Sequence, residues 1–183
     1  MPRLYFMRHA KTEINKEGVW SGRTDCSITE EGRELTRKNF SYTDNHFDQF
    51  YCSPLKRTKQ TLDVIIPGQN CVVDERIIER NSGDWEGMPY DVIDEETTEL
   101  YIQGKVQPPH GETYSEVKQR VISFVNDMFK KYSTEEILIV THATIVRMVR
   151  DVFLPEMKKG PIKNSQLVVV TDEHYKKWRE KNE

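Results

Sequence analysis

Two of the five histidines in this sequence closely follow short apolar segments, and an arginine precedes the first of them. Leu4 to Met7 leads directly into Arg8 and His9, and Ile137 to Val140 is followed after one residue by His142. A neutral imidazole can form a covalent intermediate, and a guanidinium fork matches the oxygens of phosphate or carboxylate groups. These residue types therefore indicate nucleophilic chemistry on an anionic substrate.

A second arginine, Arg57, lies shortly after the apolar segment Phe50 to Cys52. At an effective dielectric of about 20, two unit charges about 4 Å apart interact by roughly 4 kcal/mol, so Arg8 and Arg57 would dominate the recognition of a dianion. The same charges lower the pKa of a nearby histidine, which keeps it neutral and nucleophilic near pH 7. We therefore expect His9 to form a covalent intermediate with the group that it attacks.

The apolar segments indicate how the chain brings these residues together. Helical patterns alternate with short apolar runs, which predicts an α/β fold: a three-layer sandwich with a mostly parallel central sheet and helices on both faces. Ligands bind beyond the carboxyl ends of the strands in such sheets, where both histidines and both arginines would lie. The predicted strands are Leu4 to Met7, Phe50 to Cys52, Ile137 to Val140 and Leu167 to Val170.

Capping signals predict where several helices begin. Ser53 has the character of an N-cap, with Pro54 at the first helical position of a helix that Pro67-Gly68 closes. Thr113-x-x-Glu116 has the form of a capping box and precedes an apolar stripe that continues to Met128. Two further predictions are a Ser27-x-x-Glu30 box before a helix that runs to about Phe40, and a helix from Ile145 to Val152.

The segment from Asp84 to His110 is rich in glycine and proline and is predicted to pass over the sheet edge, with one helix around Tyr90 to Ile102. The chain has 183 residues, which predicts a single domain over residues 1–183.

Composition excludes several classes of function. The 27 basic and 30 acidic side chains give a net charge of -3, whereas a general nucleic-acid binder needs a basic excess, so no nucleic-acid partner is expected. No segment approaches the roughly 20 apolar residues of a membrane span, and the first residues do not form a signal peptide. Three cysteines without metal-ligand spacing indicate reduced thiols, so the expected location is cytoplasmic.

The histidines and arginines belong to a longer series of segments. In chain order these are Arg8-His9-Ala10-Lys11-Thr12 with Asn15, Trp20 to Asp25, Ile28 to Gly32, Ser53 to Thr61, Glu79 before Gly83 to Gly87, Gly111-Glu112-Thr113, Val140-Thr141-His142, and Asn164-Ser165. The series resembles the motifs of the histidine phosphatase superfamily, the group that includes the cofactor-dependent phosphoglycerate mutases, from about Leu4 to Val170. The resemblance implies a phosphoglycerate mutase-like fold.

The resemblance also implies an activity: a phosphatase that hydrolyses small-molecule phosphomonoesters through a phosphohistidine on His9, with Glu79 as proton donor and acceptor. The implied catalytic residues are His9, Glu79, Arg8, Arg57 and His142, and the implied substrate-binding residues are Arg8, Asn15, Ser21, Gly22, Arg57, His142 and Ala143. Ala10 and Ala143 stand where the family more often has glycine, and Ser82 stands where an aromatic residue is common.

Two alternative functions remain open. The first is phosphoryl transfer of the cofactor-dependent phosphoglycerate mutase type. The mutases carry a longer segment between their glutamate and their second histidine than the stretch from Glu79 to His142, which favours hydrolysis. The second is a non-catalytic phosphate-binding module, which would not need both His9 and Glu79.

The expected partner is a small phosphorylated metabolite. No metal-ligand spacing is present and flanking arginines repel a divalent cation, so neither a metal nor another cofactor is expected. Five residues are expected near the pocket rim, where they would favour a second anionic group on the substrate: Lys11, Arg23, Trp85, His110 and Tyr114. The sequence leaves the oligomeric state open.

Overall fold

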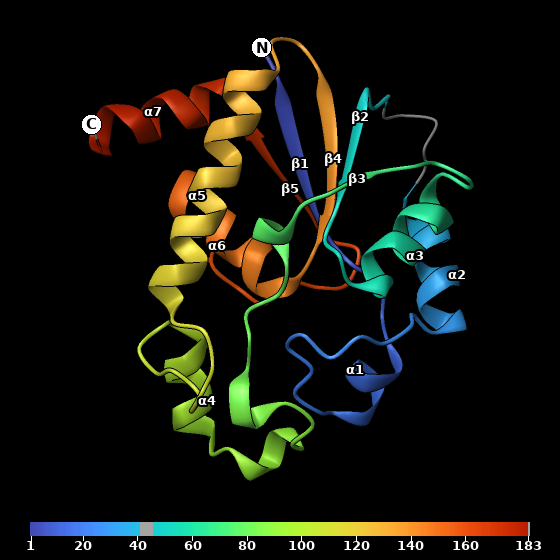
Figure 1. Cartoon of the computed structure of the whole chain (residues 1–183), viewed down its shortest axis with the longest axis vertical. Helices are drawn as coiled ribbons and strands as arrows, with labels where there is room; N and C mark the ends of the chain where they lie inside the picture. The colour runs from blue at the N-terminus through green and yellow to red at the C-terminus, as the bar shows by residue number, and fades with distance from the viewer. Residues whose placement is uncertain (41–45, 183) are drawn as a thin grey trace.

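A computed structural model describes residues 1–40 and 46–182. The described residues form a five-stranded sheet in the order β3-β2-β4-β1-β5 (Figure 1). The strands are β1 (Arg3–Arg8), β2 (Gln49–Cys52), β3 (Val72–Val73), β4 (Glu136–Thr141) and β5 (Leu167–Thr171). The α-helices are α1 (Glu13–Glu17), α2 (Glu30–Asn39), α3 (Lys56–Ile65), α4 (Glu95–Ile102), α5 (Tyr114–Lys131), α6 (Ala143–Phe153) and α7 (Asp172–Asn182).

The sheet is mostly parallel, as predicted. β1 pairs with β4, β4 with β2, and β2 with β3 in parallel, and only the edge strand β5 runs antiparallel, against β1. The four predicted strands are present. Sequence analysis missed β3, which has only two residues, both exposed.

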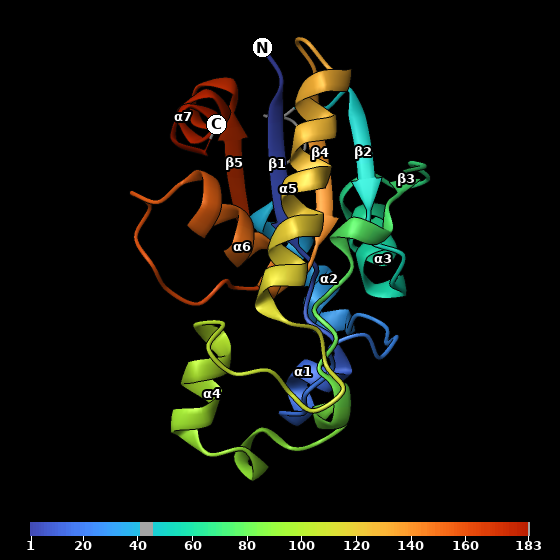
Figure 2. The same cartoon turned by 60° about the vertical axis from the view of Figure 1, so that its left-hand side comes forward.

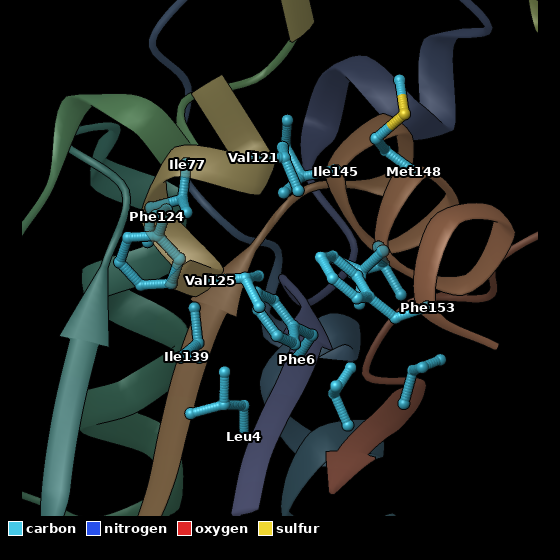
Figure 3. Packing of buried hydrophobic residues seen from close by; sticks show 14 of the residues in the cluster. Leu4, Phe6, Ile77, Val121, Phe124, Val125, Ile139, Ile145, Met148 and Phe153 are labelled. Atoms are coloured by element: carbon cyan, nitrogen blue, oxygen red, sulfur yellow. The ribbon is translucent and has the colours of Figure 1, made fainter. Parts of the chain in front are cut away.

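Alternation along the central strands supplies two apolar faces, because successive strand side chains point to opposite sides. Leu4 and Phe6 of β1 pack in the same cluster as Val121 and Phe124 of α5, together with residues of α6 (Figure 3). Met7 of β1 belongs to a second cluster, which includes residues of α3. The two views in Figures 1 and 2 show α5 and α6 on one side of the sheet and α2 and α3 on the other. The predicted three layers are therefore present.

The helix that follows β2 begins later than predicted. α3 starts at Lys56 with Leu55 in the N-cap position, and Ser53 does not cap it. The Ser53 hydroxyl is directed to His142 instead, so a residue type that often caps helices has a tertiary partner here. The predicted Ser27 box is also wrong: Thr29 is the N-cap of α2 and accepts a hydrogen bond from the Gly32 amide.

Other helical predictions agree with the structure. Thr113 and Glu116 form a reciprocal capping box at the start of α5, and α6 follows β4. The single helix predicted around Tyr90 to Ile102 is divided into a 3-10 turn, Tyr90–Val92, and α4, which Asp94 caps. Sequence analysis missed α7, in which Trp178 packs against Phe153 with ring centroids 5.0 Å apart.

Residues 86–110, here called the cover segment, lie beyond the carboxyl ends of the central strands rather than over a lateral edge of the sheet (Figure 2). The cover segment is joined to the loop between α1 and α2: the Trp20 amide donates to the Met88 carbonyl and the Tyr90 amide to the Gly18 carbonyl, both at 2.8 Å. None of the described helices combines the length and the apolar character needed to cross a bilayer.

Candidate active site

Strand register brings the two sequence-predicted histidines together. Arg8 is paired with Thr141 across the parallel β1–β4 ladder, so the residues that follow them, His9 and His142, leave the sheet side by side. The amide of His9 donates to the Thr141 carbonyl at 2.9 Å, which continues the pairing by one residue. The two imidazole centroids lie 5.2 Å apart with an angle of 62° between the rings. The predicted meeting of distant segments at this edge is therefore present.

Backbone contacts set the tautomer of His9. Its Nδ1 lies 2.7 Å from the Ala10 carbonyl oxygen, which can only accept, so Nδ1 carries the proton and Nε2 carries the lone pair. Two side chains hold this part of the backbone: Asn164 donates to the His9 carbonyl at 3.0 Å, and the Thr61 hydroxyl accepts from the Ala10 amide at 2.9 Å. His9 is thus oriented with Nε2 as its available nucleophilic atom.

The surroundings of His9 keep its imidazole neutral. Burial lowers the pKa of His9 well below its usual 6.5, and the positive charges of Arg57 and then Arg8 lower it further. The side chain is 4 % exposed. A histidine with this pKa has its nucleophilic lone pair free at neutral pH.

Arg57 enters the site from α3 and is fixed by a loop. Its two terminal nitrogens donate to the carbonyls of Gly22 and Thr24 at 2.8 and 2.7 Å. Glu86 holds that loop by accepting from the amides of Arg23 and Thr24. Gly22 has a φ of +26°, and a Cβ there would overlap with the Glu86 carboxylate, so the loop needs glycine at this point.

Several buried donors at the site have no partner within residues 1–40 and 46–182. These are Nε of Arg8, Nε of Arg57, Nε1 of Trp20 and Nδ1 of His142. One terminal nitrogen of Arg8 is anchored to the Ile162 carbonyl at 2.6 Å, so its guanidinium is fixed although Nε is unpaired. Buried polar atoms are normally hydrogen-bonded, and a group of unpaired nitrogens around two guanidiniums is the arrangement expected where an oxyanion binds.

His142 lies beside His9 but does not itself line the cavity. It is fully buried at the N-cap of α6, and its Nε2 lies 2.7 Å from the hydroxyl oxygen of Ser53. Burial, then the charge of Arg57, lowers the pKa of His142 well below 6.5, so this imidazole is also neutral.

Glu79 reaches the site from the turn after β3. Its two carboxylate oxygens accept from the amides of Arg80 at 2.8 Å and Thr144 at 3.3 Å. The turn is held from α5, because Arg120 donates to the carbonyls of Arg76 and Ile78 and is itself held by Glu112 at 2.7 Å. Glu112 and Arg120 are therefore positioning residues for the Glu79 segment, and sequence reasoning missed this role.

A cavity of about 430 Å³ opens at this place. Most of the sequence-predicted site residues line it, namely Arg8, His9, Asn15, Ser21, Gly22, Arg57, Glu79 and Ala143. Asn15 also forms a capping box with Thr12 at the start of α1, so it has a structural role as well. Of the nine predicted catalytic and substrate-binding residues, only His142 is absent from the cavity lining.

The expected rim residues do not line the cavity, although Arg23 lies next to it and donates from Nε to the Glu79 carbonyl at 3.2 Å. Lys11 pairs with Glu31 at 2.9 Å, and Arg23 with Glu112 at 3.2 Å. His110 is exposed beside Asp84, and Trp85 is buried. Tyr114 lines a neighbouring hollow, and none of the five lines the cavity at His9.

The outer wall of the cavity is formed by residues that sequence analysis did not select. Trp20, Tyr90, Tyr101 and Ile102 supply aromatic and apolar surface, and Arg147 of α6 adds a guanidinium. Tyr101 and Ile102 come from the cover segment, whose glycines and prolines gave no indication of which residues would face inward.

Arg80 attaches the cover segment to the site. This buried guanidinium donates to the carbonyls of Glu112, Tyr101 and Val106 at 2.8, 3.2 and 3.0 Å. It also lies 4.1 Å from the centroid of the Tyr101 ring. A single side chain next to Glu79 therefore fixes the wall that closes the cavity.

The departures from the family pattern have different positions. Ala143 and Ser82 line the cavity. Ala10 does not: it is buried against Ile28 and Val64. Among the described residues, no group of three or more histidine, cysteine or acidic side chains is placed to hold a metal ion.

Comparison with known proteins gives one family. The model of the histidine phosphatase superfamily, branch 1, matches residues 4–181. Phosphoserine phosphatase 1 of Hydrogenobacter thermophilus is 31% identical over 163 residues, which are 80% of this chain and 74% of that protein. The adenosylcobalamin/alpha-ribazole phosphatase of Salmonella typhimurium is 27% identical over 157 residues, 80% of this chain and 76% of that protein.

A solved structure shares the fold. The crystal structure of phosphoglycerate mutase from Thermus thermophilus superposes with a TM-score of 0.76 at 24% identity, over 93% of each chain. The predicted phosphoglycerate mutase-like architecture is thereby confirmed.

Proposed function

Because the chain belongs to the histidine phosphatase superfamily, we propose that it hydrolyses small-molecule phosphomonoesters through a phosphohistidine on His9. The observation that carries this proposal is the state of His9: a buried, neutral imidazole with Nδ1 donating to a carbonyl, beside two guanidiniums. Two relatives that each match four fifths of the chain, from Hydrogenobacter thermophilus and Salmonella typhimurium, are named as phosphatases, which supports the same reaction type.

In the first step, the Nε2 lone pair of His9 attacks phosphorus. An N–P bond forms as the P–O bond to the leaving group breaks, and Glu79 gives its proton to the departing oxygen. Arg8 and Arg57 bind the non-bridging oxygens, where a phosphoryl transition state carries its charge. The guanidiniums are fixed through Ile162 and Gly22, so little reorganisation is needed.

In the second step, water hydrolyses the phosphohistidine. Glu79, now a carboxylate, takes a proton from the water, whose oxygen bonds to phosphorus as the N–P bond breaks. The products are inorganic phosphate and His9 in its starting state. The amides of Arg80 and Thr144 hold the carboxylate in both steps.

His142 acts as a donor to the phosphoryl oxygens in this proposal. A neutral imidazole carries one proton, and donation from the Ser53 hydroxyl to Nε2 leaves that proton on Nδ1. Nδ1 is the buried nitrogen without a partner among the described residues. Ser53 is accordingly a positioning residue that selects the tautomer of His142.

Phosphate release from a panel of phosphomonoesters tests the proposal, with His9→Ala as the inactive control. Brief reaction with ³²P-labelled substrate followed by alkaline denaturation should leave label on His9, because phosphohistidine is stable to base. Isomerisation of 3-phosphoglycerate without phosphate release would indicate a mutase. Phosphate binding without either reaction would indicate a binding module. Either result would refute the proposal.

A further inference from the structure

Arg147 places an unpaired guanidinium on the cavity wall. It projects from α6 and is half-buried, yet no hydrogen bond or ion pair to it occurs within the described part of the chain. Arg150, on the same helix, differs: it bonds to Asp151 at 3.0 Å and to the Gly160 carbonyl at 2.7 Å. The helix thus holds one arginine in a structural role and leaves the other available.

The charges on the cavity wall are unbalanced. Its lining contains three guanidiniums, those of Arg8, Arg57 and Arg147, and one carboxylate, Glu79. Burial lowers the pKa of Arg8, and the charge of Arg147 lowers it further, which places the two guanidiniums within electrostatic reach. A phosphoryl dianion accounts for Arg8 and Arg57. In the proposed first step Glu79 carries the proton that it gives to the leaving group, so the positive charge of Arg147 then has no counterpart on this wall.

The cavity continues past Arg147. A neighbouring hollow of about 760 Å³ shares Ile102, Arg147 and Pro161 with the cavity at His9. Lys105 and Lys159 also line it, and neither has an ion pair among residues 1–40 and 46–182. Two acidic side chains, Glu99 and Asp151, line the hollow as well, and Asp151 pairs with Arg150. Basic side chains still outnumber acidic ones along this continuous surface.

Apart from these charged groups, the cavity wall is largely aromatic and apolar. Trp20, Tyr90 and Tyr101 present aromatic surface, and Arg147 is the charged group that remains once the reacting groups are assigned. A guanidinium fork on such a wall selects a planar or tetrahedral oxyanion, because it offers two parallel donors.

We propose that Arg147 forms a second anion subsite, and that the substrates are phosphomonoesters carrying a second anionic group, a carboxylate or a further phosphate. This inference rests on the proposed function. The transferred phosphoryl lies between His9, Arg8 and Arg57, and the second group lies at the junction of the two hollows.

Matched substrate pairs test the subsite. 3-Phosphoglycerate and glycerol 3-phosphate differ by a carboxylate, and fructose 1,6-bisphosphate and fructose 6-phosphate differ by a phosphate. We expect kcat/KM to favour the more anionic member of at least one pair by roughly tenfold to a hundredfold, the range of a charge-assisted hydrogen-bonded pair. Which pair shows the preference identifies the group.

In the Arg147→Gln variant, the ratio of kcat/KM values between the two members of that pair should fall to nearly one. Arg147→Lys should retain part of the wild-type ratio. Arg37→Gln, an exposed arginine that pairs with Glu30, is the matched control and should keep the wild-type ratio. Equal loss on both members of a pair would show that Arg147 serves the transferred phosphoryl instead. No preference in the wild type, or no change in Arg147→Gln, would also overturn the subsite.

A binding measurement on the wild type needs neither turnover nor a variant. 3-Phosphonopropionate carries a carboxylate that methylphosphonate lacks, and 1,3-propanediphosphonate carries a second phosphonate. At least one should bind about tenfold more tightly than methylphosphonate by calorimetry. Equal affinities for all three would refute the subsite. Absence of His9-dependent phosphate release with this preference intact would refute the proposed reaction alone.

Discussion

The Nε2 atom of His142 lies 2.7 Å from the hydroxyl oxygen of Ser53, and both side chains are completely buried. The two residues follow the neighbouring strands β4 and β2, so the sheet itself brings them together. A buried imidazole with one fixed partner has one preferred tautomer. In the proposed mechanism the Ser53 hydroxyl donates to Nε2, which leaves Nδ1 as the nitrogen of His142 that can donate to a ligand.

Ser53→Ala should lower kcat/KM by about tenfold to a hundredfold, because it leaves Nε2 of His142 unpaired and allows the proton to move from Nδ1. ¹⁵N chemical shifts of the imidazole should change from one tautomer to a mixture. Ser123→Ala is the matched control, because it removes a hydroxyl on α5 that accepts a hydrogen bond from Arg76. An unchanged tautomer in Ser53→Ala would contradict this role.

Glu79→Gln should nearly abolish the hydrolysis of alkyl phosphates, with a loss of about 10² to 10⁴ in kcat, because their leaving groups need a proton. Release of p-nitrophenol, a good leaving group, should suffer far less in a single turnover. Steady-state and burst kinetics separate the two steps. The exposed Glu95→Gln should behave as the wild type. An equal loss on both classes of ester would exclude the acid role.

The histidines should make the fold sensitive to acid. The pKa of His9 and of His142 is lowered well below 6.5 by burial first, so below pH 6.5 the unfolded chain binds protons that the folded chain does not. Stability is full above this pH and decreases as the pH falls. Each histidine can remove at most about 2 kcal/mol from the free energy of unfolding at pH 5, a limit that the unfolded pKa of about 6.5 sets.

Urea denaturation at pH 7 and pH 5, in buffer without phosphate, measures this effect. His9→Asn should reduce the loss of unfolding free energy between the two pH values, by up to about 2 kcal/mol. His46→Asn, at an exposed position, should leave the loss as it is in the wild type. If both variants lose the same free energy as the wild type, the buried histidines do not carry the pH dependence.

Gly22→Ala should reduce both stability and activity. The new Cβ would meet the Glu86 carboxylate and displace the loop whose carbonyl anchors Arg57. Gly68→Ala is the matched control, since its φ of +77° is also positive but nothing lies within 4 Å of the added carbon. Gly68→Ala should cost only about 1–2 kcal/mol of stability, from its backbone conformation.

For Gly22→Ala we expect a larger loss of stability and a decrease in kcat/KM of about tenfold or more. Thermal unfolding and steady-state kinetics give the two quantities. Gly22→Ala and Gly68→Ala with the same Tm and activity would show that the loop adapts without moving Arg57.

The sequence predicted the parts of the fold that local signals specify. Continuous apolar runs marked β1, β2, β4 and β5, and the Thr113 box marked the start of α5. β3 was missed because two exposed valines carry no periodicity. α7 is mostly charged, and its attachment through Trp178 is a tertiary contact that no local pattern contains.

The site was predictable as a set of residue types but not in its supporting contacts. Eight of the nine selected residues line the cavity, because strand ends and motif order determined where they lie. The pattern at Ser53 predicts a helix cap, because serine is common at that position. The serine hydroxyl can also bond a distant side chain, and here it bonds His142. Arg147 lies one turn beyond the start of α6, and only the structure shows that no acidic side chain neutralises it among the described residues.

The attachment of the cover segment through Arg80 has an evolutionary consequence. The strand ends that carry the proposed reacting groups and the stretch that supplies Tyr101 and Ile102 are separate parts of the chain. The Arg80 guanidinium connects them by binding main-chain carbonyls of that stretch. Main-chain carbonyls are present whatever the side chains are. Mutations can therefore accumulate in this stretch and change which ligands the cavity accepts, while the proposed reacting groups at the strand ends stay in place.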